Sequence, residues 1–209
     1  MLTSKTVTEF LDELASNSAA PGGGSISALA GALSAGLTSM VCRLTIGKKK
    51  YADMQNEMEK ILRESEELRR ILTLLIDEDT AAFNEVMAAF ALPKETPEQQ
   101  QLRSDAIQTA TKKASLIPLE VMRHAATAAS IAKSAAEKGN SNSITDAGVA
   151  ALSARTACSG AMMNVLINLG SLKDQEFVTT TRKEAKTISE TVEATVGATL
   201  QHIGKVLGM

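Results

Sequence analysis

Aromatic residues are scarce in this 209-residue chain, which contains no tryptophan, one tyrosine and four phenylalanines. Residues that favour strands are thinly spread, whereas the helix formers alanine, leucine, methionine, lysine and glutamate are plentiful. With so few large side chains, the core must be built from Ala, Leu, Ile, Val and Met. The composition therefore predicts an all-α protein in which small residues let helix backbones approach closely.

Several kinds of chemistry lack the residues that they require. Cys42 and Cys158 have no C-x-x-C spacing, so we expect buried free thiols in a reducing compartment. His124 and His202 stand far apart without acidic neighbours at ligand spacing, so we expect no transition-metal site. The net charge of −2, with both signs interspersed, argues against a nucleic-acid partner.

A long uncharged segment, residues 14–42, resembles a membrane span only at first sight. Pro21, three consecutive glycines and many serines leave its uninterrupted apolar length too short to cross a bilayer. The first residues also lack the apolar core of a signal peptide. We therefore expect no membrane partner and a cytoplasmic location.

Hydrophobic periodicity and the positions of proline and glycine divide the chain into helices. The segment that starts at Ser25 is small and uncharged on nearly every face, so it should lie at the centre of the fold. We predict one domain over residues 1–209, a bundle of about six helices with long antiparallel members. The predicted helices cover about residues 6–17, 25–46, 52–90, 98–138, 145–169 and 181–207.

Asp79 is the candidate catalytic residue with the clearest physical signal. Its neighbours one helical turn away are all apolar, so it lies in the middle of a buried stripe. Desolvation there raises the pKa of a carboxyl group, which suits a general acid or base near neutral pH. The structural alternative is a buried aspartate bonded to a neighbouring helix end or to a basic partner. The apolar neighbours are Leu75, Ile76, Ala82 and Phe83.

A run of three glycines precedes the predicted central helix. Gly22, Gly23 and Gly24 open onto Ser25, where free backbone N–H groups and the helix dipole favour a polar or anionic ligand. The run lacks the lysine and the spacing of a phosphate-binding loop. A flexible turn before a buried helix is the alternative interpretation.

A second polar turn joins the fourth and fifth predicted helices. Asn140 and Asn142, followed by Asp146, place amides and a carboxylate close together. These groups suit a polar ring as a ligand. The segment from Ser143 to Asp146 also fits a helix-capping pattern, so a purely structural role stays open.

Two further features are candidates for ligand binding. Lys48 and Lys50 belong to a basic run that suits a carboxylate-bearing ligand, although such a run is usually only a solvated corner. Asn164 and Asn168 stand one helical turn apart in an apolar stretch. Their amides suit each other, a helix carbonyl or a polar ring as partner.

Six short motifs lie along the chain in the order found in a known family. They are PGGGS at 21–25, TIGKKKY at 45–51, Asp79 with the AF pair at 82–83, LPK at 92–94, GNSN at 139–142 with DAGVA at 146–150, and NV at 164–165 with NL at 168–169. Together they resemble the cyclodeaminase family, which contains formiminotetrahydrofolate cyclodeaminase and stand-alone methenyltetrahydrofolate cyclohydrolase. The resemblance spans nearly the whole chain, although Thr145 replaces the serine expected before Asp146.

The resemblance implies an all-α enzyme that assembles as a homodimer or a higher homo-oligomer. The implied reaction converts 5-formiminotetrahydrofolate to 5,10-methenyltetrahydrofolate and ammonia by acid–base catalysis, and needs neither metal nor redox cofactor. The first alternative is a cyclohydrolase, in which water opens the methenyl compound to 10-formyltetrahydrofolate. The second is a non-catalytic protein that binds folate or assists assembly.

On this resemblance each candidate residue receives an expected role. Asp79 is the acid–base carboxylate, and Asp146 is its partner or a pterin-binding group. Asn140 and Asn142 orient the pterin, while Gly22 to Ser25 shape the pocket floor. Lys48 or Lys50 binds the glutamate tail, and Asn164 is a further substrate-binding residue.

Overall fold

The computed structural model describes residues 1–209 and contains helices without strands, which confirms the predicted all-α fold. The helices are α1 (Val7–Leu14), α2 (Gly23–Thr45), α3 (Gln55–Phe90), α4 (Pro97–Lys138), α5 (Ile144–Leu169) and α6 (Gln175–Leu207). Three short 3-10 turns, η1 (Leu2–Ser4), η2 (Lys49–Met54) and η3 (Ser141–Ser143), complete the chain.

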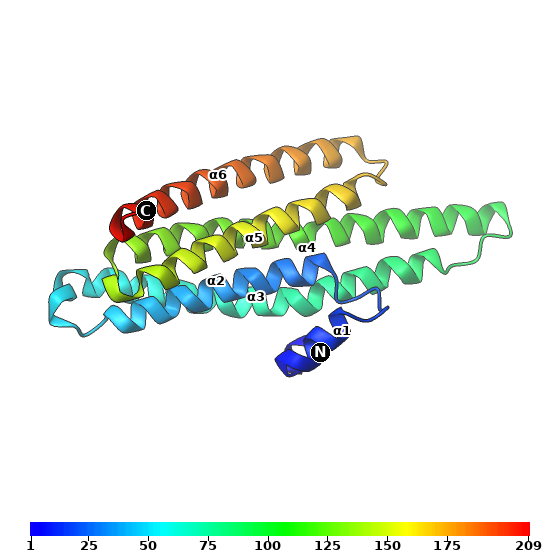
Figure 1. The fold of residues 1–209 in the computed structure, drawn as a ribbon. Coiled ribbons are helices and arrows are strands. Elements are labelled where there is room, and N and C mark those ends of the chain that lie inside the picture. The colour runs from blue at the N-terminus through cyan, green and yellow to red at the C-terminus, as the bar shows by residue number, and fades with distance from the viewer.

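Helices α2 to α6 run side by side as one long bundle, and α1 lies apart on its flank (Figure 1). The hairpin of α3 and α4 extends beyond the start of α2 and the end of α5. By length and composition α2 alone could cross a membrane. However, 61% of its most apolar window is buried within the bundle, as expected for a central core helix.

Small residues bring the helix backbones of the core close together. A Cβ atom added to Gly31 on α2 would lie 3.0 Å from the side chain of Leu72 on α3 and 3.5 Å from Ala157 on α5. Gly160 on α5 leaves similar space for Ser27 on α2, since an added Cβ would overlap the serine hydroxyl. The core therefore depends on close approach between backbones, with few large side chains.

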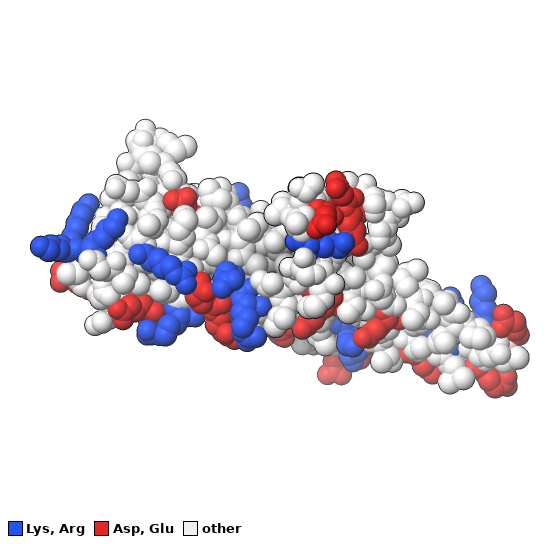
Figure 2. All heavy atoms as spheres, turned by 90° about the horizontal axis from the view of Figure 1, so that it is seen from below, with Lys and Arg blue, Asp and Glu red and all other residues white.

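The outer surface carries charges of both signs. Seen from the side that bears α1, basic and acidic side chains are interspersed, with basic groups prominent at the end that carries η2 (Figure 2). Arg43 of α2 and Arg69 of α3 both pair with Glu66, at 3.1 and 2.8 Å. Exposed pairs of this kind contribute little to stability, so the fold depends mainly on its apolar core.

The bounds of two helices differ from the prediction. Helix α2 begins at Gly23, two residues early, so the last two glycines of the run form its first turn. Helix α6 begins at Gln175, six residues early, because Asp174 caps it by accepting a hydrogen bond from the backbone N–H of Phe177.

The start of α3 also differs from the prediction. It begins at Gln55, later than the predicted residue 52, because Tyr51 has a non-helical backbone within η2. Gly139 has extended geometry, and not the left-handed conformation typical of a glycine cap. Glycine is needed there because an added Cβ would overlap the carbonyl of Ala135.

We expect Leu72→Ala to lower the free energy of unfolding by about 2–5 kcal/mol, because it leaves a cavity where Leu72 is wholly buried against Gly31. Leu74→Ala, at a position that is 45% exposed on the same helix, should change stability by no more than about 0.5 kcal/mol. Urea unfolding followed by circular dichroism measures both values. Equal effects of the two substitutions would contradict the assigned packing.

Candidate active site

A pocket of about 330 Å³ lies where the α3–α4 hairpin extends past the start of α2 and the end of α5 (Figure 1). Five segments of the chain contribute to its wall, and the lining includes no lysine or arginine. Its volume is at the lower end of the usual range for ligand sites. The lining residues are Ala19, Ala20, Gly22, Gly23, Gly24, Asp79, Phe83, Val86, Ala114, Asn164, Ile167 and Asn168.

The carboxyl group of Asp79, on α3, lies against the first turn of α2. The hydroxyl of Ser25 donates a hydrogen bond to Asp79 Oδ2 at 2.9 Å and lies 3.2 Å from the hydroxyl of Thr80. A Cβ on Gly24 would overlap the carboxyl group, which explains why glycine is required at that position. The carboxylate thus lies beside the N-terminal N–H groups of α2, which have no partners within the helix, and the backbone of Ser25 also stabilises it.

Two opposing effects determine the pKa of Asp79. Desolvation by burial is the larger and raises the pKa above its ordinary value, while hydrogen bonds from the side chain and backbone of Ser25 lower it in part. The net direction is upward. The carboxyl group can therefore bind and release a proton at a higher pH than an exposed aspartate, as acid–base catalysis requires.

Two asparagines of α5 lie across the pocket from Asp79. The amide N–H of Asn164 donates to the carbonyl of Gly160 at 2.9 Å, and that of Asn168 donates to the carbonyl of Ala114 at 3.1 Å. Each amide oxygen remains available as a hydrogen-bond acceptor for a ligand. Asn168 therefore joins Asn164 as a candidate binding residue.

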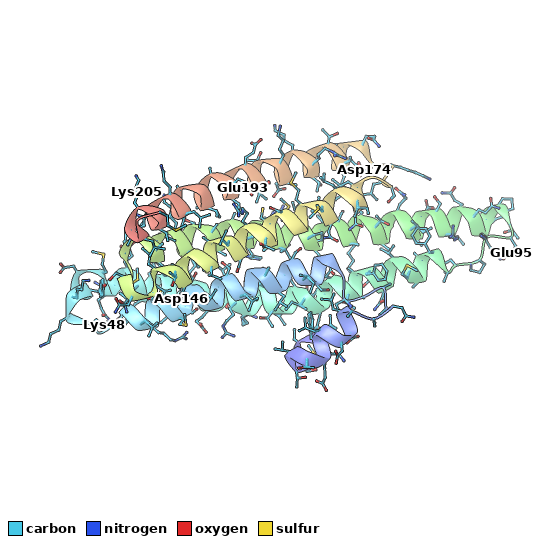
Figure 3. All side chains as sticks on the ribbon, in the orientation of Figure 1. Lys48, Glu95, Asp146, Asp174, Glu193 and Lys205 are labelled. Atoms are coloured by element: carbon cyan, nitrogen blue, oxygen red, sulfur yellow. The ribbon has the colours of Figure 1, made fainter.

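The predicted site residues fall into two groups. Six lie at the pocket: Gly22, Gly23, Gly24, Ser25, Asp79 and Asn164. Five lie at the other end of the bundle: Lys48, Lys50, Asn140, Asn142 and Asp146. Figure 3 shows Lys48 and Asp146 at that end, opposite Glu95 at the tip of the α3–α4 hairpin.

The separation of the two groups follows from the length of α2. Asn140 bonds through its backbone N–H to the hydroxyl of Thr45, the last residue of α2, at 2.8 Å. The 23 residues of α2 span about 33 Å at the usual helical rise. These residues therefore cannot all line one pocket within a single chain.

The contacts of Asn140 do not fit a residue that orients a ligand. Its side chain is almost wholly buried, donates to the carbonyl of Leu44 at 3.1 Å and accepts from the backbone N–H of Asn142 at 3.2 Å. Both ends of the amide are thus used to fix the turn. Asn142, by contrast, is exposed, as are Lys48 and Lys50.

The contact between Tyr51 and Ser141, also at this end of the bundle, was not predicted from the sequence. The hydroxyl of Tyr51 accepts a hydrogen bond from the backbone N–H of Ser141 at 2.9 Å and lies 3.1 Å from the serine hydroxyl. The hydrogen bonds with Ser141, and then Lys50, lower the pKa of Tyr51 to about 8. No local pattern reveals this pair, because 90 residues separate its members.

Comparison with known proteins gives consistent matches. A model of the formiminotransferase-cyclodeaminase family matches residues 6–187. A methenyltetrahydrofolate cyclohydrolase from Methylorubrum extorquens is 45% identical over 184 residues, covering 88% of each chain. A formimidoyltransferase-cyclodeaminase from Rattus norvegicus is 34% identical over 193 residues, which are 89% of this chain and only 36% of that protein. The crystal structure of formiminotetrahydrofolate cyclodeaminase from Thermotoga maritima covers 100% of this chain and 98% of its own, with a TM-score of 0.82 and 32% identity.

We expect Ser25→Ala to raise the pKa of Asp79 further, because it removes a hydrogen bond that stabilises the carboxylate while burial remains. Carbon-13 NMR of labelled aspartate carboxyls measures the pKa, and loss of one signal in Asp79→Asn assigns it. Thr80→Ala is the matched control, since its hydroxyl contacts Ser25 and not the carboxyl group. If the pKa of Asp79 stays unchanged or falls in Ser25→Ala, the hydrogen bond of Ser25 does not lower that pKa, and this explanation is wrong.

Proposed function

This chain belongs to the formiminotransferase-cyclodeaminase family of folate-dependent one-carbon enzymes, and we propose that its pocket at Asp79 binds a tetrahydrofolate derivative. The observation that carries the proposal is the position of Asp79. Its carboxyl group combines burial, a raised pKa and two neighbouring amide oxygens in one pocket. That set of groups suits proton transfer beside a polar ring.

The proposed chemistry takes place at a carbon carried by N5 and N10 of the folate. In hydrolysis, water attacks the methenyl carbon, and in cyclodeamination N10 attacks the formimino carbon. Both attacks form a tetrahedral carbon, and both release a proton from the attacking atom. Asp79 in its ionised form accepts that proton, so one carboxylate serves either reaction.

Hydrolysis of methenyltetrahydrofolate to 10-formyltetrahydrofolate is the reaction that the comparisons favour. The cyclohydrolase relative is 45% identical and matches over most of both chains. Cyclodeamination, which the sequence analysis placed first, is the second candidate. The structural likeness to a cyclodeaminase over the whole chain supports it, at a lower identity of 32%.

A homodimer is the assembly that fits the surface. The residues of α5 that are exposed between Thr145 and Ile167 are uncharged, and neighbouring α2 adds exposed apolar side chains. Arg155, whose side chain is 40% exposed, pairs with Glu193 of α6. A contiguous apolar surface of this kind marks a protein–protein contact. The large exposed residues on the two helices are Leu33, Met40, Leu44, Val149, Leu152, Met163 and Ile167.

A second copy that packs antiparallel on this face brings the two groups of predicted site residues together. A two-fold axis across the middle of α2 and α5 places the start of α2 in one subunit against its end in the other. The pocket then gains Lys48, Lys50, Asn142 and Asp146 from the partner subunit. These lysines supply the positive charge that a glutamate tail requires and that the pocket of one chain lacks.

The reaction is tested by offering the purified protein each folate and following the near-ultraviolet absorbance of the methenyl compound. We expect the protein to accelerate the loss of added methenyltetrahydrofolate. Cyclodeamination would be seen instead as appearance of the methenyl compound from the formimino compound.

We expect Asp79→Asn to lower kcat at least about 100-fold, because it removes the proton acceptor. Glu78→Gln, at an exposed neighbouring position, should leave kcat unchanged. Full turnover in Asp79→Asn would refute the catalytic role, and folate binding without turnover by the wild type would indicate a binding protein.

The dimer is tested by solution mass. We expect the wild type to sediment as a dimer and Leu33→Asp to sediment as a monomer with little activity, because a charge is buried in the apolar contact. Leu102→Asp is the control, since Leu102 is 69% exposed on the α3–α4 hairpin, away from this face. A wild-type monomer with full activity would contradict the proposed assembly.

A further inference from the structure

The hydroxyl group of Tyr51 joins η2 to the turn between α4 and α5. Its oxygen accepts from the backbone N–H of Ser141, which can only donate. The phenol O–H remains a proton donor, and the hydroxyl of Ser141 lies 3.1 Å from its oxygen.

The charges around Tyr51 favour release of this proton. The ammonium of Lys50 lies 5.2 Å from the centre of the ring, and 3.5 Å from the hydroxyl of Ser141. Ser141, on η3, and Lys50, on η2, are the groups that act on the phenol, and together they lower its pKa to about 8. An oxygen held by a fixed N–H donor beside a cation needs little rearrangement when it becomes a phenolate.

The position of Tyr51 places it at the mouth of the proposed composite site. It follows Lys48 and Lys50 in sequence and is anchored to the turn that carries Asn142. In the antiparallel dimer this end of one subunit faces the Asp79 pocket of the other. The inference therefore rests on the proposed function and on the proposed dimer.

We propose that Tyr51 is a second proton-transfer residue of this enzyme and serves the Asp79 pocket of the partner subunit. In hydrolysis, Asp79 takes a proton from water as the C–O bond forms. The N5–C bond then breaks, its electron pair stays on N5, and N5 takes the proton of Tyr51. The phenolate recovers a proton from the carbinol hydroxyl as the C=O bond forms, and Asp79 releases its proton to solvent.

The same residue serves cyclodeamination. There the formimino group reacts in its protonated form, so attack by N10 leaves a neutral amino group on the tetrahedral carbon, and Asp79 accepts the proton of N10. The C–N bond to that amino group then breaks with its electron pair on nitrogen. Tyr51 donates its proton to that nitrogen, so that ammonia leaves. The protonated Asp79 then returns a proton to the phenolate through water.

Ionisation of Tyr51 can be followed by absorbance, because it is the only tyrosine and the chain contains no tryptophan. Near-ultraviolet absorbance during a pH titration therefore reports this phenol alone. We expect an apparent pKa of about 8 in the wild type and a higher value in Ser141→Ala. Because the phenol must be protonated to act as the acid, activity should fall above this pKa. The basic limb of the kcat profile should then move to higher pH in Ser141→Ala. If the basic limb of the kcat profile does not shift when the pKa of Tyr51 shifts, the proposal is wrong.

Mixed dimers test whether Tyr51 acts across the interface. We expect Tyr51→Phe to keep its dimer and its KM but to lose at least about tenfold in kcat. Mixing unfolded Tyr51→Phe and Asp79→Asn chains and refolding them gives mixed dimers in which one of the two sites is intact. Random pairing then restores about a quarter of the wild-type activity. Full activity of Tyr51→Phe would overturn the catalytic role, and absence of restoration in confirmed mixed dimers would overturn the action across subunits. Failure of the wild type on both folates would instead refute the proposed function.

Discussion

The contact between the Asp79 carboxyl group and the first turn of α2 is the constraint on which the rest of the pocket depends. It requires glycine at position 24, because any side chain there would occupy the place of the carboxyl group. It positions Ser25 as a hydrogen-bond donor and joins α3 to the start of the central helix. The same contact keeps the carboxylate partly stabilised while burial raises its pKa, so one arrangement joins two helices and supports the proton transfer proposed for Asp79.

The sequence predicted much of this half of the site for physical reasons. An aspartate among apolar neighbours must be buried, and a glycine run before an uncharged helix indicates a close approach of some other group. The structure is compatible with both interpretations of Asp79, because the carboxyl group accepts a hydrogen bond from the first turn of a neighbouring helix and also lines the pocket. What the local pattern did not reveal is the partnership between Asp79 and Ser25, which lie 54 residues apart.

The other half of the site could not be placed from sequence. The order of motifs along a sequence does not give the distances between them in the fold. The resemblance grouped residues that lie at opposite ends of the bundle, because the whole length of α2 separates them. Asn140 has the residue type of a ligand-binding amide, but its bonds to Leu44 and Asn142 give it a structural role. Tyr51 was overlooked for the opposite reason, since its chemistry arises from a contact with distant Ser141. The proposed antiparallel dimer would bring the two groups of residues together in one site.

The central claim is that the one-carbon unit of a folate is bound beside Asp79. A crystal structure of the protein with 5-formyltetrahydrofolate, whose formyl group occupies the position of the reacting carbon, tests it most directly. We expect that group within about 3 Å of an Asp79 carboxyl oxygen, with pterin atoms at the amides of Asn164 and Asn168. A folate bound elsewhere on the bundle, with the Asp79 pocket empty, would contradict it.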